Sequence, residues 1–135
     1  MIKKTLITGT IFGVTAIVFG AFGAHALKEL LTAQALSSFK TAVNYQMYHA
    51  LFLLIFGVLQ SKYGKKLTGV IYYFCTLGVL CFSGSIYFLV LNKSFHFVEV
   101  SKWFALITPL GGALLISAWI FLGVYLVKNV KEGLS

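Results

Sequence analysis

The sequence has little charge: only 10% of its 135 residues are charged, and just three of them are acidic. An ordinary water-soluble domain carries about 25% charged residues, because polar side chains have to cover its core. Here 59% of the residues are hydrophobic. A surface that faces lipid needs no polar cover, so the composition excludes an ordinary soluble domain and predicts an integral membrane protein.

Arginine is absent, and the formal net charge of +8 comes from eleven lysines. A basic protein that binds nucleic acid gathers its positive charges on one face or stripe. These lysines stand between long apolar runs instead, where they set membrane topology. We therefore expect membrane lipid, and not nucleic acid, as the surroundings of the chain.

Only two cysteines occur, Cys75 and Cys81, six positions apart inside an apolar run. This spacing fits neither a redox CxxC pair nor a metal site, so we expect two small buried side chains. The GxSxG and HExxH motifs are missing, and no apolar run contains an acidic residue that pairs with a histidine. The sequence therefore indicates no metal site and leaves any cofactor unknown. Its lack of a complete catalytic set argues against an enzyme.

Four apolar runs are long enough to cross a membrane, which takes about 20 helical residues. Short polar connections join them, and we find no repeat and no linker. The sequence thus predicts an all-α integral membrane protein, an antiparallel bundle of four transmembrane helices in a single domain over residues 1–135. The predicted spans are residues 5–24, 41–59, 67–91 and 104–127.

The longest connection, residues 27–40, carries its apolar side chains near one helical face. This pattern is typical of a short interfacial helix. It is equally typical of neighbouring spans that extend beyond the membrane. Both interpretations stay open on the sequence alone.

Seven lysines lie near the termini and between the second and third spans, against four in the other two connections. The positive-inside rule then places both termini in the cytoplasm. The first run also resembles a secretory signal peptide, because it follows two lysines and precedes Ala24-His25-Ala26. Its length exceeds the usual apolar segment of such peptides, so we expect it to be retained.

Small residues recur on one face of the first predicted span, at alternating steps of four and three. In lipid such residues allow close helix contacts, within a bundle or between subunits. In the fourth span, a proline and a glycine pair predict a loosened or kinked helix. The predicted helix-packing residues are Gly9, Gly13, Ala16, Gly20, Gly23, Pro109, Gly111 and Gly112.

The second span has a polar face, on which Tyr45, Gln46 and His49 follow Ala42 at offsets of three, four and seven. An unsatisfied polar group in lipid costs roughly several kcal/mol, so we expect this face to point inward. An ionisable residue inside a membrane is by default a candidate functional group. The alternative is a neutral histidine that is hydrogen-bonded to a neighbouring helix.

Depth along the helices links this face with polar residues of the other spans. At 1.5 Å per residue from the inner ends, His49 lies roughly 16 Å up, Ser83 and Ser85 roughly 25 Å, and Thr108 and His25 roughly 28 and 30 Å. We therefore predict a shared polar pocket in the outer half. Its candidate ligand-binding residues are His25, Tyr45, Gln46, His49, Ser83, Ser85 and Thr108.

Two functions follow from this pattern. The first is a protein that binds a lipid head group, a quinone or a similar small amphiphile in that pocket. The second is a structural or assembly protein, in which the same residues form a hydrogen-bond network and small-residue faces join a second copy or another membrane protein. An oligomeric channel or transporter ranks below both, because the inner half offers little polar path.

Four ordered motifs also resemble a known family. They are GAFGAHALK at residues 20–28, FKTAVNYQ at 39–46 with His49, FSGSIY at 82–87, and ITPLGG at 107–112 with Trp119. The chain resembles the YgdD/YwdK-type family, small bacterial inner-membrane proteins grouped as a domain of unknown function, with a similar small transmembrane protein in animals. The resemblance covers nearly the whole chain. It implies four spans and a retained first helix, and it implies no activity.

Overall fold

The computed structural model describes residues 1–62 and 68–130, and nearly all of these residues are helical. Four helical segments are long and apolar enough to cross a membrane, as predicted. The third span consists of α3, a π-helical turn η1 and α4, which follow one another without a break. The elements are α1 (Ile2–Ala24), α2 (Ala33–Lys62), α3 (Thr68–Val79), η1 (Leu80–Gly84), α4 (Ser85–Phe95), the 3-10 helix η2 (Lys102–Leu106) and α5 (Ile107–Val130).

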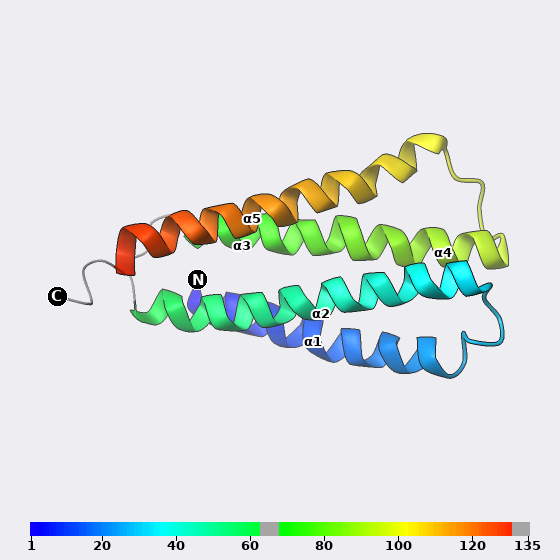
Figure 1. The fold of residues 1–135 in the computed structure, drawn as a ribbon, viewed down its shortest axis with the longest axis horizontal. Helices are drawn as coiled ribbons and strands as arrows, with labels where there is room; N and C mark the ends of the chain where they lie inside the picture. The colour runs from blue at the N-terminus through cyan, green and yellow to red at the C-terminus, as the bar shows by residue number, and fades with distance from the viewer. Residues whose placement is uncertain (63–67, 131–135) are drawn as a thin grey trace.

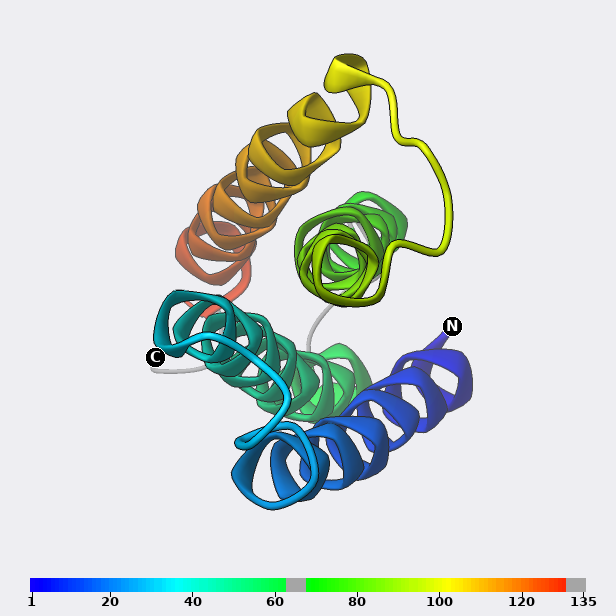
Figure 2. The ribbon, with the colours of Figure 1, turned by 90° about the vertical axis from the view of Figure 1, so that its right-hand side faces the viewer.

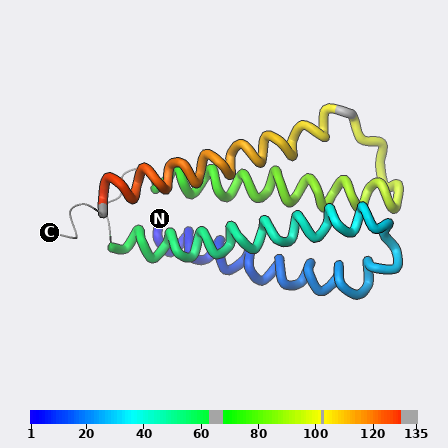
Figure 3. Tube along the Cα trace, in the orientation of Figure 1, coloured from blue at the N-terminus to red at the C-terminus, as the bar shows by residue number. Residues whose placement is uncertain are grey.

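The four spans run antiparallel along one axis (Figures 1 and 3). We call the end with the α1–α2 and α4–α5 connections the connection end, and the opposite end, where α1 begins and α5 ends, the terminal end. Viewed from the connection end, α1 lies beside α2, and α5 lies beside the third span on the other side (Figure 2). The helices therefore form two pairs, which meet where α2 contacts α3, η1 and α4.

The core lies between α2, the third span and α5. Large buried side chains from all three meet there, such as Phe56 of α2, Ile71 of α3 and Tyr125 of α5. A smaller cluster at the connection end packs Leu31 and Phe39 against Val90 of α4. The outward faces carry exposed Ile, Val, Leu and Phe side chains, as expected for helices surrounded by lipid.

The segment between the first two spans contains no separate interfacial helix. Residues 25–30 form turns, and residues 33–40 are the first turns of α2, so the second of the two interpretations is correct. The start of α2 is defined by Thr32, whose side-chain oxygen accepts a hydrogen bond from the backbone N–H of Ala35 at 3.2 Å. A threonine in this position satisfies an N–H group that the helix itself leaves without a partner.

The small-residue face of α1 packs against α2. A β-carbon added at Gly9 would lie 3.0 Å from the backbone oxygen of Ala50, and one at Gly23 would lie 3.1 Å from the ring of Phe39. Gly20 approaches Val43 in the same way, Gly13 approaches Ala50, and Ala16 is fully buried. This face therefore serves contacts inside the chain.

Pro109, at which a loosened or kinked helix was expected, does not interrupt α5, which is α-helical from Ile107 to Val130. Pro109 is the third residue of α5, and a proline in the first turn is tolerated because its missing N–H is hardly needed there. The irregular turn lies in the neighbouring span, at η1. Gly111 faces it: a β-carbon added there would overlap the backbone nitrogen of Phe82 and lie 2.8 Å from its Cα.

We expect Gly111→Ala to destabilise the bundle by about 1–3 kcal/mol, because the new methyl group meets backbone that cannot move aside. Gly123→Ala on the same helix is the matched control, since a β-carbon there meets nothing within 4 Å. It should be neutral, or stabilise by up to about 1 kcal/mol through helix propensity. Thermal unfolding in mild detergent measures both, and equal stability of the two variants would contradict the close approach of α5 to η1.

Candidate functional site

Gln46 is the polar centre of the bundle and connects three helices. Its side-chain nitrogen donates to the backbone oxygen of Phe12 at 3.0 Å and to Oγ1 of Thr15 at 2.6 Å, both on α1. Its oxygen accepts a hydrogen bond from the hydroxyl of Tyr87 on α4 at 2.9 Å. Gln46 is buried, so these bonds replace the water that a buried amide lacks.

His49 is buried one turn further along α2 and connects it to α5. The indole N–H of Trp119 donates to Nε2 of His49 at 3.2 Å, and Nδ1 lies 2.7 Å from the backbone oxygen of Tyr45. An indole N–H can only donate, so Nε2 accepts and the ring proton is on Nδ1, facing the carbonyl. Both ring nitrogens are thus occupied, and a metal or haem would first have to displace Trp119.

Ser83, Ser85 and Thr108 form a second set of contacts between helices. Ser83, buried in η1, donates to the backbone oxygen of Ala42 on α2 at 2.8 Å. On the other side of the same span, the hydroxyl groups of Ser85 and Thr108 lie 2.6 Å apart and join α4 to α5. These three residues therefore fix the third span between α2 and α5.

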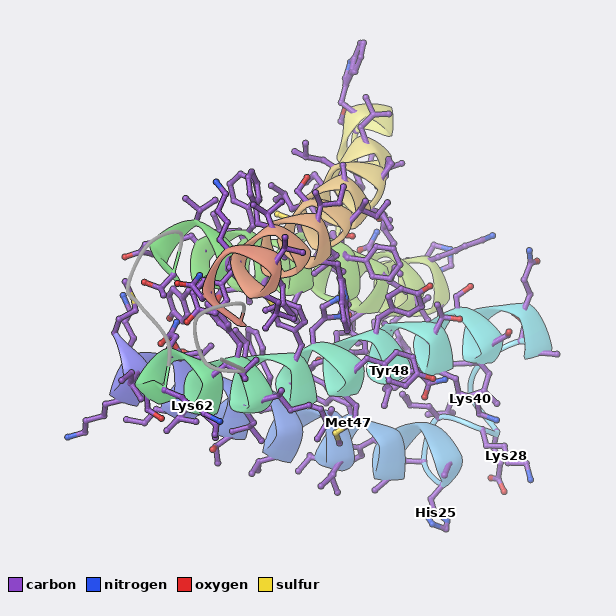
Figure 4. All side chains as sticks on the ribbon, turned by 60° about the vertical axis from the view of Figure 1, so that its left-hand side comes forward. His25, Lys28, Lys40, Met47, Tyr48 and Lys62 are labelled. Carbon is purple, nitrogen blue, oxygen red and sulfur yellow. The ribbon has the colours of Figure 1, made fainter. Side chains whose placement is uncertain are left out.

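His25 and Tyr45, the other two candidate residues, lie differently. His25 ends α1 and is exposed, and its side chain points away from the bundle (Figure 4). Tyr45 is also exposed, and its ring packs on Phe82 with 4.8 Å between the ring centroids. The structure thus uses five candidates in separate contacts between helices and brings only Ser85 and Thr108 into contact with each other. It leaves Tyr45 on an exposed surface and His25 pointing away from the bundle.

A groove at the connection end is lined by other residues. It runs between α2 and α4 and consists of two cavities of about 430 and 250 Å³, which share Ser38, Leu89 and Val90. We call it the α2–α4 groove. Its lining residues are Leu30, Thr32, Gln34, Ala35, Ser38, Thr41, Ile86, Leu89, Val90, Lys93 and Ser94.

The sequence carried a signal for this groove. Gln34, Ser38, Thr41 and Tyr45 stand at steps of four, three and four, so they share one face of α2. Ile86 of the third span lines the smaller cavity together with Thr41. One turn further along α2, the ring of Tyr45 packs on Phe82. Our sequence interpretation started this face at Ala42 and so missed its first three polar residues.

The fold and the polar contacts define a class: a small integral membrane protein with four transmembrane helices, oriented by hydrogen bonds between them. The comparison with known proteins agrees. Residues 19–112 match the family described as "Protein of unknown function (DUF423)", and the chain belongs to this family. No solved structure matches this chain.

Relatives of the chain are named as membrane proteins. A UPF0382 membrane protein of Staphylococcus haemolyticus is 36% identical over 128 residues, covering 95% of this chain and 98% of the relative. YwdK of Bacillus subtilis is 37% identical, covering 93% and 98%, and the inner membrane protein YgdD of Escherichia coli is 30% identical, covering 96% and 94%. These names confirm the membrane assignment and the resemblance seen in the sequence.

We expect Gln46→Leu to cost about 1–3 kcal/mol of stability, because it leaves the half-buried hydroxyl of Tyr87 without its acceptor. Adding Tyr87→Phe removes that hydroxyl, so the double variant should lose less than the sum of the single losses. Asn44→Leu, an exposed position on the same helix, is the control and should change little. Unfolding in detergent compares Gln46→Leu, Tyr87→Phe, the double variant and Asn44→Leu with the wild type. Strictly additive losses would contradict the Gln46–Tyr87 bond.

Proposed function

We propose that this protein binds a membrane amphiphile in the α2–α4 groove, with the polar head at the connection end. The observation that carries the proposal is the lining of the groove. Its end is lined by hydroxyl, amide and ammonium groups of Thr32, Gln34 and Lys93, and its deeper part by Ile86 and Leu89. A site with a few polar groups above apolar walls orients a molecule that has a head and a tail.

The position of the groove along the membrane supports the same assignment. Lys40 and Lys62 of α2 are 22 positions apart, which is about 33 Å along a helix and close to the roughly 30 Å of the hydrocarbon core. Residues before Lys40, such as Gln34 and Ser38, then lie at the level of the lipid head groups. Thr41 and Ile86 lie just inside the hydrocarbon, where an acyl or prenyl chain begins.

The polar residues first predicted as ligand contacts have another part in this proposal. Gln46, His49 and Ser83 already bind neighbouring helices. The bonds of Gln46 to α4 and of Ser83 to α2 hold α2 and the third span at the spacing that leaves the groove open. A role in assembly through the α1 glycine face has less support, because α2 covers that face.

The orientation of the chain completes the proposal. Lys3, Lys4, Lys62 and Lys128 lie at the terminal end. The other three lysines that the sequence assigns to this side, Lys65, Lys66 and Lys131, lie outside the described residues. Lys28, Lys40, Lys93 and Lys102 belong to the connection end, at which Figure 4 shows the first two. Seven lysines against four favour termini in the cytoplasm and a groove in the outer leaflet.

Filling the groove should expel its occupant. Ser38 lines both cavities, so Ser38→Phe should reduce the amphiphile that is retained after purification in mild detergent by about tenfold, equal to ~1.4 kcal/mol. Native mass spectrometry measures the retained mass and its stoichiometry. Ser37→Phe adds the same ring at an exposed neighbouring position and should retain the wild-type amount.

Equal retention by both variants, with both folded, would place any bound molecule elsewhere and overturn the proposal. A wild-type protein that carries no amphiphile even in nanodiscs of native lipid would overturn it as well. If that protein is also an oligomer, the role in assembly becomes the better explanation.

The proposed orientation is tested with single cysteines in a chain that carries Cys75→Ala and Cys81→Ala. A membrane-impermeant maleimide should label Lys40→Cys in intact cells, because Lys40 then faces outward. It should label Lys62→Cys only after the membrane is made permeable. The reverse pattern would place the groove in the inner leaflet and refute the lysine argument.

A further inference from the structure

We infer that the α2–α4 groove selects an anionic phospholipid over a zwitterionic one, through Lys93. This inference rests on the proposed function, and it names the class of amphiphile that the groove takes. It follows from the charge of the lining, from the hydrogen-bond donors beside Lys93 and from the shape of the groove.

The charge of the lining has one sign. Lys93, in the last turn of α4, is the ionisable side chain among the residues that line the two cavities. Glu29 belongs to the turn between α1 and α2, next to Leu30. Glu99 lines a neighbouring cavity, to which Lys93 also contributes, and does not line the groove. The groove therefore presents a positive head-group end, which favours a ligand with a net negative charge.

The polar groups beside Lys93 suit a phosphate. The side-chain oxygen of Thr32 accepts from the N–H of Ala35, so its hydroxyl hydrogen is left to donate outward. Gln34 adds an amide NH₂ group at the same rim. Phosphate oxygens only accept hydrogen bonds, and bonds between charged groups are the stronger ones.

The shape of the groove favours a lipid over a free anion. The larger cavity, which contains Lys93, continues into the smaller one, which is lined by Ile86 and Leu89 next to Thr41. The ring contact between Tyr45 and Phe82 lies one turn deeper. A free phosphate would use the rim alone, whereas a phospholipid fills the rim with its head group and the apolar part with a chain.

The test offers the full-length protein an equimolar mixture of phosphatidylglycerol and phosphatidylcholine with identical chains, and native mass spectrometry counts the bound lipid. The wild type should bind the anionic lipid about fivefold more often, as expected for one charge-assisted contact. Lys93→Gln should bind both lipids equally, and Lys93→Arg should keep the preference. Lys40→Gln is the control: it removes the same charge two residues from Ser38, but on nearly the opposite side of α2. This variant should also keep the preference for the anionic lipid.

The outcomes separate this inference from the proposed function. If the wild type shows no preference, or if Lys93→Gln keeps it, the anionic selection is wrong. The groove itself would still stand if Ser38→Phe expels the lipid. If excess inorganic phosphate releases the lipid from the wild type, the rim is a site for free anions, and the lipid assignment is overturned. Lys93 is exposed, so its variants should unfold at the wild-type temperature, which confirms that they are folded.

Discussion

The structure depends on one constraint, that a carboxamide buried between apolar helices has to find its hydrogen-bond partners within the protein. Gln46 meets it by donating to α1 and accepting from Tyr87 of α4. These bonds set the rotation and the height of three helices at once. His49 likewise finds its partner in Trp119 of α5, and Ser83 of η1 finds its partner in the backbone oxygen of Ala42 on α2. Polar residues inside this bundle thus orient helices, and the side chains that line the α2–α4 groove come from faces next to them.

The spans could be predicted from the sequence because lipid imposes a minimum apolar length on every crossing helix. The inward positions of Gln46 and His49 were predicted from the free-energy cost of an unsatisfied polar group in lipid. The burial of both side chains confirms them. The beginning of α2 was harder to place, because Lys40 suggested the membrane boundary while Thr32 caps the helix eight residues earlier. A lysine near the start of an apolar run does not have to mark the start of its helix, and the turns of α2 before Lys40 form one side of the groove.

The candidate site was predicted less completely, for a geometrical reason. Counting residues gives height along a helix but says nothing of the direction in which a side chain points around the axis. Ser85 and Thr108 were placed at similar heights and do meet, whereas His25 belongs to the same end and faces away from the bundle. To predict the groove, one must also know the register of α2 against α4. That register depends on packing between segments that lie far apart in the chain.

The pairing of the helices has a consequence for how the protein is made. Because α1 packs mainly against α2, and α5 against α3 and η1, each half of the chain contains a helical hairpin with its own close contacts. The first hairpin is complete once Lys62 has left the ribosome, so it can associate in the bilayer before the second is synthesised. The hydrogen bonds of Tyr87 to Gln46, of Ser83 to Ala42 and of Trp119 to His49 are then the contacts by which the second hairpin docks on the first.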